Sequence, residues 1–164
     1  MTSSCGVCGK ESIRAVQRRL PPVRSRQMVG TNLLAQLPEK LRAAQPTFER
    51  TGGLHAAGLF TREGELIVAR EDIGRHNAVD KVIGFGLLNG LLPYDNRVLV
   101  VSGRASFEIM QKSLAARIPI VCAVSAPSSL AVEFARTSRQ TLVGFLRAER
   151  MNIYSGRSRV FLPK

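Results

Sequence analysis

From residue 51 onward, short apolar runs alternate with segments of helical spacing, and this alternation limits the possible folds more than any other feature. The runs 97–101 (RVLVV) and 119–124 (PIVCAV) are almost entirely apolar, which is typical of strands buried on both faces. Residues 107–117 and 128–137, which follow these runs, have the apolar spacing of helices. The pattern predicts an α/β fold, a three-layer α/β/α arrangement with a mixed sheet.

The flanking segments complete this fold. Residues 53–60 and 65–71 flank the short loop TREG and predict a β-hairpin. Residues 75–89 predict a helix, and residues 141–147 and 151–155 predict the closing strands. A chain of 164 residues with 45% hydrophobic composition is long enough for one domain with a core. The predicted order is helix, hairpin, helix, strand, helix, strand, helix, strand.

The first 48 residues predict helices and a connector. Between residues 31 and 48, apolar residues recur at helical spacing, at Leu33, Leu34, Leu37, Leu41 and Ala44. We expect Pro38 to open a second helical piece rather than to lie inside one helix. Residues 10–27 hold six basic residues and a Pro-Pro break, which indicates a short helix and an exposed connector. We therefore divide the chain into residues 1–30, a mobile C-x-x-C loop with a basic connector, and residues 31–164, the α/β domain.

The charge of the chain favours an anionic partner. Lys and Arg number 24 against 12 Asp and Glu, a formal charge of +12, and most of the cations are arginines, which suit phosphate contacts. A nucleic-acid-binding module that uses the basic N-terminal arm is one alternative. Only 5% of the residues are aromatic and Trp is absent, which disfavours nucleic acid.

No apolar stretch approaches the length that spans a bilayer and no secretory signal is visible, so we expect a cytoplasmic protein with no membrane partner.

Three loops follow strands of the predicted sheet, where helix N-termini offer free backbone amides. They are REDIGRHN (70–77), SGRAS (102–106) and SAPSS (125–129), and each combines small residues with hydroxyls or cations. Together they predict a pocket, although SGRAS alone would fit a turn and SAPSS alone a helix cap. His76 could contact a phosphate, act as a base, bind a metal or be structural, and the same alternatives hold for His55.

Zinc deaminases have a similar order of elements, with H-x-E at one helix start and P-C-x-x-C at the next. The corresponding residues here are His76–Ala78 and Ser102–Ser106. Ala78 replaces the general acid/base glutamate, and SGRAS contains no cysteine ligand. The order of elements is deaminase-like, but the sequence excludes deamination chemistry.

The sequence CGVC near the start of the chain contains Cys5 and Cys8. A structural zinc site normally has four ligands, and no second C-x-x-C or C-x-x-H is present, so a small zinc-binding protein is a weaker alternative and we assign no metal ligands. A thioredoxin-type site needs a preceding strand, which is not predicted here. Lys10 and Arg14 would favour the thiolate that a sulfur carrier needs. Cys122, within an apolar strand, is expected to be core.

Six strings, CGVCGKES, TGGLHAA, REDIGRHNAVDKVIG, SGRASFEI, AVSAPSSLAVE and GFLRAERMNIY, together closely resemble the FdhD family, the sulfurtransferases that formate dehydrogenase requires. The resemblance covers nearly all of residues 3–155 and implies a cytidine deaminase-like core. It also implies that a cysteine desulfurase loads sulfur onto the C-x-x-C, and that the protein passes it to the Mo-bis(molybdopterin guanine dinucleotide) cofactor of formate dehydrogenase. By the same resemblance, Cys5 carries the persulfide and Cys8 assists it.

The resemblance assigns cofactor binding to Phe145, Leu146, Arg147, Ala148, Glu149 and Arg150. The residue types fit, because the arginines can bind phosphates, Glu149 can accept from guanine N1–H and N2–H, and Phe145 can stack. The cofactor is expected as a substrate-like ligand, and a guanine nucleotide is expected to fit the same site. Arg75, His76 and Arg104 would contact its pyrophosphate or pterin portions. We also expect a homodimer, and we expect family members to be longer, with a further segment ahead of the C-x-x-C.

Overall fold

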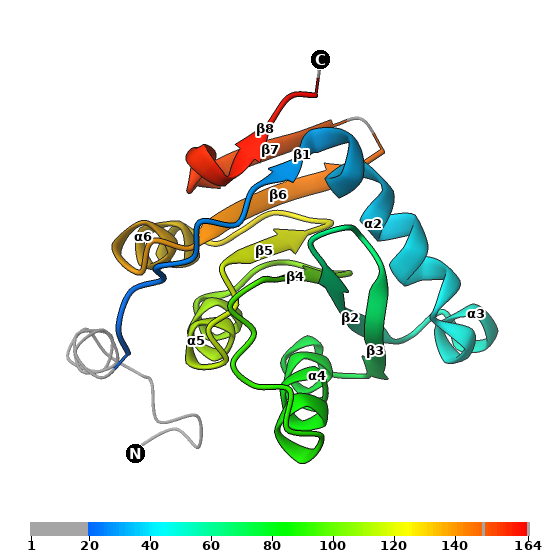
Figure 1. Ribbon diagram of the computed structural model, residues 1–164. Coiled ribbons are helices and arrows are strands. Elements are labelled where there is room, and N and C mark those ends of the chain that lie inside the picture. The colour runs from blue at the N-terminus through cyan, green and yellow to red at the C-terminus, as the bar shows by residue number, and fades with distance from the viewer. Residues whose placement is uncertain (1–19, 149, 164) are drawn as a thin grey trace.

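The structure, a computed structural model, describes residues 20–148 and 150–163. Its centre is a six-stranded sheet in the order β3-β2-β4-β5-β6-β7 (Figure 1). The strands are β2 (His55–Thr61), β3 (Leu66–Asp72), β4 (Arg97–Val101), β5 (Ile120–Ala123), β6 (Thr141–Arg147) and β7 (Arg150–Ser155). Strands β4, β5 and β6 are parallel, whereas β2 is antiparallel to β3 and β4, and β7 is antiparallel to β6. The sheet is therefore mixed, as predicted.

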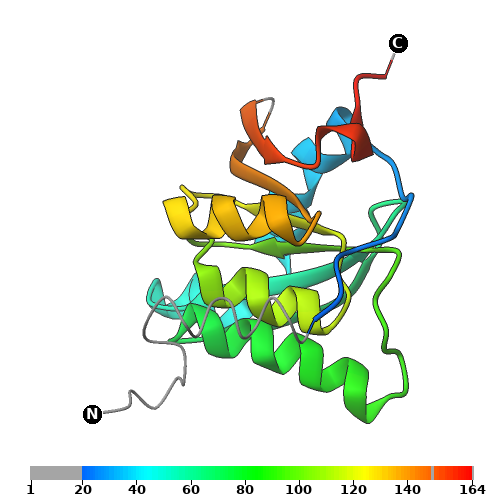
Figure 2. The ribbon, with the colours of Figure 1, turned by 90° about the vertical axis from the view of Figure 1, so that its left-hand side faces the viewer.

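Helices cover both faces of this sheet, which confirms the three-layer prediction. Helices α4 (Arg75–Leu88), α5 (Phe107–Ala115) and α6 (Ser129–Thr137) lie side by side on one face (Figure 2). The other face carries α2 (Thr31–Ala43) and a two-stranded sheet of β1 (Val29–Gly30) and β8 (Val160–Phe161). Helix α3 (Pro46–Thr51) follows α2, and the 3₁₀ turn η1 (Arg157–Arg159) precedes β8. None of the helices in the described ranges is long and apolar enough to cross a membrane.

Two apolar cores lie on opposite sides of the sheet. Along β4, Leu99 and Val101 face the core that α4, α5 and α6 cover. Val98 and Val100 of the same strand face the core that α2 covers. Burial on both faces explains why the sequence of this strand is continuously apolar rather than alternating. The parallel strands end at one edge of the sheet, so the loops that follow them lie close together.

The expectation that Pro38 begins a second helix is wrong, because α2 runs unbroken through this residue. A proline inside a helix removes one backbone donor and costs about 3 kcal/mol. Leu34, Leu37 and Leu41 of this helix are at most 1% exposed. Burying each leucine stabilises the fold by about 1.5–3 kcal/mol, so their packing outweighs the cost of the proline. The second helix begins instead at Pro46, where the first helical position needs no N–H donor.

The described part of the basic connector exposes its cations, Arg24 and Arg26, as expected, but it buries apolar residues beside them. Val23 is 6% exposed, and its backbone N–H donates to the Ser138 carbonyl at 2.9 Å. Val29 pairs with Val160 in the small parallel sheet. The apolar residues between the cations therefore anchor residues 20–30 to the domain. Residues 1–19, which hold the predicted short helix, lie outside the described residues.

Candidate functional site

The three loops singled out in the sequence meet at the carboxyl ends of β3, β4 and β5. Ala105 forms a parallel bridge with Pro127, and the Gly103 carbonyl accepts from the Ser125 amide at 3.3 Å. A pocket of about 330 Å³ lies among these loops, and we name it the arginine pocket. Its polar lining consists of Arg75, Arg104, Ser106 and Ser128. The loops therefore form a pocket, as predicted.

Three helices begin at the arginine pocket. Arg75 is the first residue of α4, Ser106 caps α5 and Ser128 caps α6. The Ser106 hydroxyl accepts from the Ile109 amide at 3.4 Å, and the Ser128 hydroxyl accepts from the Ala131 amide at 3.2 Å. A single cap satisfies one of the four amides that a helix N-terminus leaves without intrahelical partners. The remaining amides and the helix dipoles favour an anion at this position.

His76, in the first turn of α4, is tied to α5. Its Nε2 lies 2.8 Å from the Ser106 hydroxyl and 3.0 Å from the Glu108 carboxylate. Burial lowers the pKa of His76, the charge of Glu108 opposes this, and Arg75 lowers the pKa further, so the net shift is downward. The downward shift favours the neutral form of the ring. These contacts fit the structural alternative for His76, and its contact with a phosphate stays a prediction.

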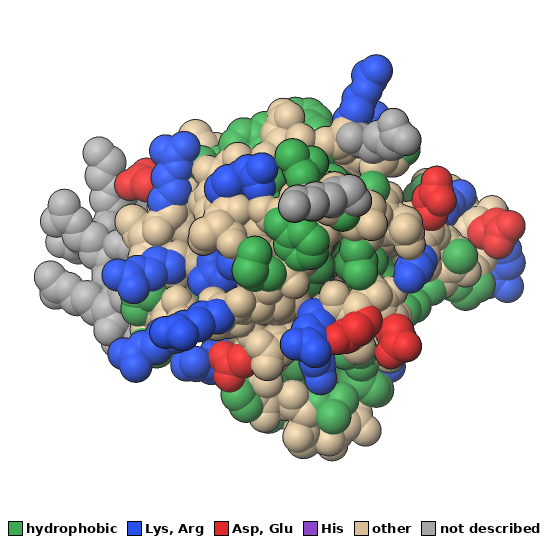
Figure 3. Space-filling view, turned by 45° about the horizontal axis from the view of Figure 1, so that its top comes forward, with side chains coloured by type: hydrophobic (Ala, Val, Ile, Leu, Met, Phe, Trp, Pro, Cys, Tyr) green, Lys and Arg blue, Asp and Glu red, His purple; other side chains and the backbone are tan. Residues whose placement is uncertain are grey.

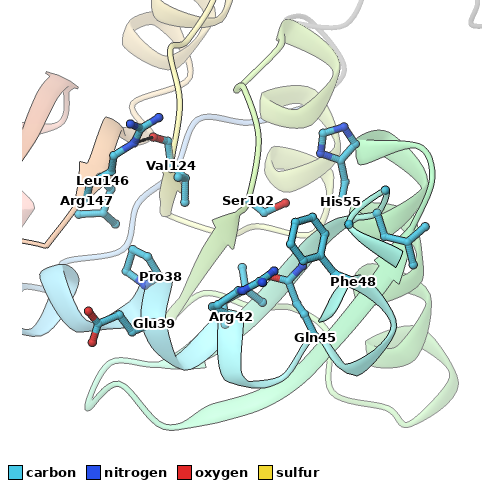
Figure 4. Close-up of a pocket in the computed structure, with 14 residues that line it drawn as sticks. Pro38, Glu39, Arg42, Gln45, Phe48, His55, Ser102, Val124, Leu146 and Arg147 are labelled. Atoms are coloured by element: carbon cyan, nitrogen blue, oxygen red, sulfur yellow. Dashed lines mark hydrogen bonds between the residues drawn. The ribbon is translucent and has the colours of Figure 1, made fainter. Parts of the chain in front are cut away.

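A larger pocket of about 640 Å³ opens at the same edge of the sheet, and we name it the apolar pocket (Figure 4). Leu41, Phe48 and Leu146 give it apolar walls. Glu39, Gln45, His55 and Arg147 add polar groups around these walls. The Arg42 guanidinium, which also lines the pocket, lies 4.0 Å from the centroid of the Phe48 ring. The pocket thus combines a flat aromatic surface with donors and acceptors of hydrogen bonds.

Helix α3 is held at the apolar pocket by Glu71, near the end of β3. The Glu71 carboxylate accepts from the amides of Thr47 and Phe48 at 3.0 and 2.6 Å. Burial raises the pKa of Glu71, but hydrogen bonds from these amides lower it by more, so the pKa lies below its ordinary value. This anchor keeps the Phe48 ring against the pocket.

The residues of the predicted cofactor-binding segment, 145–150, lie in different surroundings. Leu146 is fully buried, and it lines the apolar pocket together with Arg147, whose Nε donates to the Val124 carbonyl at 3.4 Å. Phe145 is 42% exposed at a φ of 52°, Ala148 has a φ of 45°, and Arg150 begins β7 as an exposed residue. None of these three lines either pocket. Glu149 lies outside the described residues.

One short stretch of backbone separates the two pockets. Ser102 lines the apolar pocket, Arg104 lines the arginine pocket, and Gly103 joins them. A Cβ at Gly103 would lie 3.2 Å from His55 Nδ1 and 4.0 Å from Arg75 Cδ. Glycine therefore lets a side chain from each pocket approach the same piece of backbone.

Sequence reasoning missed the contribution of α2 and α3 to a pocket. The sequence predicts only packing helices in residues 31–48, yet four side chains of these helices line the apolar pocket, those of Glu39, Arg42, Gln45 and Phe48. The contact between Arg42 and Phe48 depends on the turn between the two helices, which no sequence motif marks. The sequence does contain a set of polar residues near the end of α2, but such residues indicate only a solvent-exposed face of the helix.

The structure describes Cys122 but not the two cysteines of the C-x-x-C motif. Cys5 and Cys8 lie outside the described residues, so their roles stay predictions. Cys122 is fully buried in β5, and burial raises the pKa of its thiol to about 12, as expected of a core residue. Among residues 20–148 and 150–163, no three His, Cys, Asp or Glu side chains form a group that could hold a metal ion.

These features define a three-layer α/β domain with adjoining apolar and cationic pockets at the carboxyl edge of its sheet. The model of the FdhD/NarQ family matches residues 1–161, and the chain belongs to this family. Curated relatives named sulfur carrier protein FdhD occur in Streptomyces avermitilis, at 58% identity over 168 residues, and in Mycobacterium tuberculosis, at 54% over 161 residues. The family resemblance read from the sequence is confirmed.

These alignments cover 98% and 97% of this chain but 58% of each relative, so the chain spans less than two thirds of their length. A similar solved structure is the crystal structure of a candidate formate dehydrogenase accessory protein from Desulfotalea psychrophila. It is 30% identical to this chain with a TM-score of 0.80. The match covers 90% of this chain and 62% of that chain, which agrees with the fold described above.

Proposed function

We propose that this chain is a sulfur carrier that accepts sulfur on Cys5, with Cys8 assisting, and passes it to the Mo-bis(molybdopterin guanine dinucleotide) cofactor of formate dehydrogenase. The observation that carries the proposal is the C-x-x-C motif in a chain that the FdhD/NarQ model matches over residues 1–161. The names of the curated relatives, sulfur carrier protein FdhD, support it.

Loading of sulfur onto Cys5 requires one nucleophile and one leaving group. The Cys5 thiolate attacks the outer sulfur of a persulfide on a cysteine desulfurase. A new S–S bond forms on Cys5, the S–S bond of the donor breaks, and the donor cysteine leaves as a thiolate, so the exchange needs no oxidant or reductant. Cys122 is unsuited to this step because it is fully buried and its pKa is raised to about 12.

The apolar pocket is our proposed site for the guanine end of the cofactor, which is a substrate of this protein. Its volume of about 640 Å³ falls within the range of small-molecule sites, about 300–1,000 Å³. Phe48 and Leu146 offer apolar surface to a purine, and Glu39 offers an acceptor to its N–H groups. Arg147 lies at the same pocket and suits a phosphate. A free guanine nucleotide would bind in the same place, and acceptance of guanine N–H groups by Glu149 stays a prediction.

The proposed partners follow from this role. A cysteine desulfurase supplies the sulfur, and formate dehydrogenase is the enzyme whose cofactor receives it. The name of the Desulfotalea psychrophila protein, a formate dehydrogenase accessory protein, supports the second partner. We place the transfer in the cytoplasm, where reducing conditions keep free thiols available. The working assembly is proposed to be a homodimer, and a sedimentation experiment would test this.

Mass spectrometry tests the loading step. The wild-type chain, incubated with an active cysteine desulfurase and cysteine, should gain one sulfur atom on the peptide that contains Cys5. Cys5→Ala should abolish this gain, whereas Cys122→Ser should retain it if circular dichroism shows a folded chain. A label that persists in Cys5→Ala but disappears in Cys122→Ser would contradict the proposal, and so would the absence of any label on the wild-type chain.

A further inference from the structure

We propose that five exposed arginines, at the edge of the sheet opposite the two pockets, form a docking surface for an acidic patch on a cysteine desulfurase. The inference rests on the proposed function and deepens it, because it states where the sulfur donor binds. We name these arginines the basic surface, and they are Arg24, Arg26, Arg136, Arg139 and Arg157.

The first support is that the fold itself joins the three segments that carry these arginines. The guanidinium of Arg159 donates to the Ser25 carbonyl at 3.0 Å and to the Arg139 carbonyl at 2.9 Å. Next to these contacts, the Val23 amide donates to the Ser138 carbonyl at 2.9 Å. The basic surface is therefore preformed, and binding a partner would require little further ordering of the backbone.

The second support is that the charge of the basic surface is not neutralised. Residues 22–28, 136–142 and 155–163 contain six arginines and no Asp or Glu. Within the described residues, none of the five arginines of the basic surface forms an ion pair. Glu133, one turn before Arg136, makes no ion pair with it, and Asp95 is paired with Arg117 at 2.8 Å. A positive field therefore remains for a partner.

The third support is the kind of side chain that adjoins the cations. Lys and Arg side chains gather on the left of Figure 3, the side on which α6 lies in Figure 1, with apolar side chains beside them. Met28, Phe161 and Leu162 are 56%, 43% and 71% exposed in and beside β1 and β8, which adjoin the basic surface. Protein interfaces are enriched in Arg, Met and aromatic residues, whereas nucleic acid is bound mainly through phosphate contacts. The mixture favours a protein partner.

The fourth support is the position of the basic surface, which favours the sulfur donor over the sulfur acceptor. Both pockets lie at the carboxyl ends of the strands, whereas Arg139 precedes the start of β6 at the opposite edge. A protein docked there would leave the pockets free for the cofactor. Leu20, the first described residue, lines a small cavity with Ser138, and Cys8 precedes Leu20 by twelve positions. Twelve residues span at most about 40 Å, a length that reaches a docked enzyme.

Charge reversal tests the docking surface through two measurements, the Kd for a purified cysteine desulfurase and the rate at which that enzyme labels Cys5. One variant combines Arg24→Glu with Arg26→Glu, and a second combines Arg136→Glu with Arg139→Glu. Each should raise the Kd by about tenfold or more at low salt and slow the labelling, because like charges would then face each other. The affinity of the wild-type chain should fall as sodium chloride is added. Two variants in different segments keep the test valid if one of them fails to fold.

Two controls separate docking from general effects of charge and from damage to the cysteine. The matched control variant combines Arg50→Glu with Arg62→Glu, which reverses two exposed charges outside the basic surface and should behave as the wild-type chain. The second control replaces the enzyme with cysteine persulfide, a small donor that needs no docking surface. Every variant should gain sulfur on Cys5 from this donor at the wild-type rate.

The outcomes separate this inference from the proposed function. Wild-type Kd and labelling rate in both double variants would overturn the docking surface and leave the sulfur-carrier proposal intact. Equal slowing with the enzyme and with cysteine persulfide would also overturn it, because the arginines would then act on Cys5 and not on the enzyme. Binding of single-stranded RNA that the variants abolish, with desulfurase binding unchanged, would assign the surface to nucleic acid. No label on wild-type Cys5 from either donor would contradict the carrier proposal, while the Kd values would still decide the docking surface.

Discussion

The apolar pocket and the arginine pocket lie at the same edge of the sheet, yet they are built in different ways. The apolar pocket depends on helix α2, which covers the face of the sheet opposite α4, α5 and α6, and on helix α3, which follows α2. It also depends on buried side chains such as Leu41 and Leu146. The arginine pocket is formed by loops and helix starts that directly follow β3, β4 and β5. The first pocket therefore depends on long-range packing, and the second depends on local backbone and charge.

Two adjacent carboxylates hold these pockets in place. Glu71 accepts from the amides of Thr47 and Phe48 and so positions α3 at the apolar pocket. Asp72 accepts from the Gly74 amide at 2.9 Å and pairs with Lys81, and so positions the loop that leads to Arg75. Because successive residues of a strand point to opposite faces, one strand end can anchor both pockets. Variants of each anchor can then test the pockets separately.

The largest effect is expected for Leu146→Ala. This side chain is fully buried between the sheet and the apolar pocket, so its truncation should lower the free energy of unfolding by about 2–5 kcal/mol. Urea denaturation measures the change. Leu162→Ala, at a position 71% exposed, is the matched control and should have little effect. A similarly small effect at Leu146 would show that the floor of the pocket is not packed as described.

Phe48→Ala should weaken binding of the base of a nucleotide but not binding of its phosphates. Loss of a stacking surface should weaken binding of guanosine and of GDP by the same amount, about 1–3 kcal/mol. Calorimetry with both ligands measures this pattern. If Phe48→Ala weakened only GDP, the base would not lie in the apolar pocket.

Glu71→Ala should destabilise the fold by about 1 kcal/mol, as expected for the loss of a carboxylate that caps a helix. The reason is that the amides of Thr47 and Phe48 would lose their acceptor. Thermal unfolding measures the change, and Glu65→Ala, an exposed residue of the same hairpin, is the control. Equal melting temperatures for the two variants would show that α3 does not depend on this anchor.

The smallest effect is a pH dependence caused by Asp72. The hydrogen bond from Lys81, followed by those from Gly74 and Asn77, lowers the pKa of Asp72 from 3.8 to about 2. A carboxyl with a lowered pKa stabilises the fold above its unfolded pKa, and this contribution is lost as the pH falls. Wild-type stability should therefore decrease between pH 4 and pH 2 by more than that of Asp72→Asn. Parallel curves of unfolding free energy for the two proteins would contradict this assignment.

Local features of the sequence predicted the arginine pocket better than the apolar pocket. The apolar runs 97–101 and 119–124 identified the central strands, and the order of elements then placed three loops at one edge. The apolar pocket could not be found in this way, because it joins Arg42 and Phe48 to strand ends far away in sequence. The prediction for Pro38 is wrong for a related reason, because the packing that offsets the cost of this proline is tertiary. The positive φ of Phe145 has no sequence signal either.

A crystal structure of the chain with bound GDP tests the central claim most directly, because it places both ends of one ligand at once. We expect the guanine ring in the apolar pocket, against Phe48 and Leu146, and a phosphate within hydrogen-bond distance of Arg147. A guanine ring outside the apolar pocket, or phosphates with no contact to Arg147, would contradict this expectation.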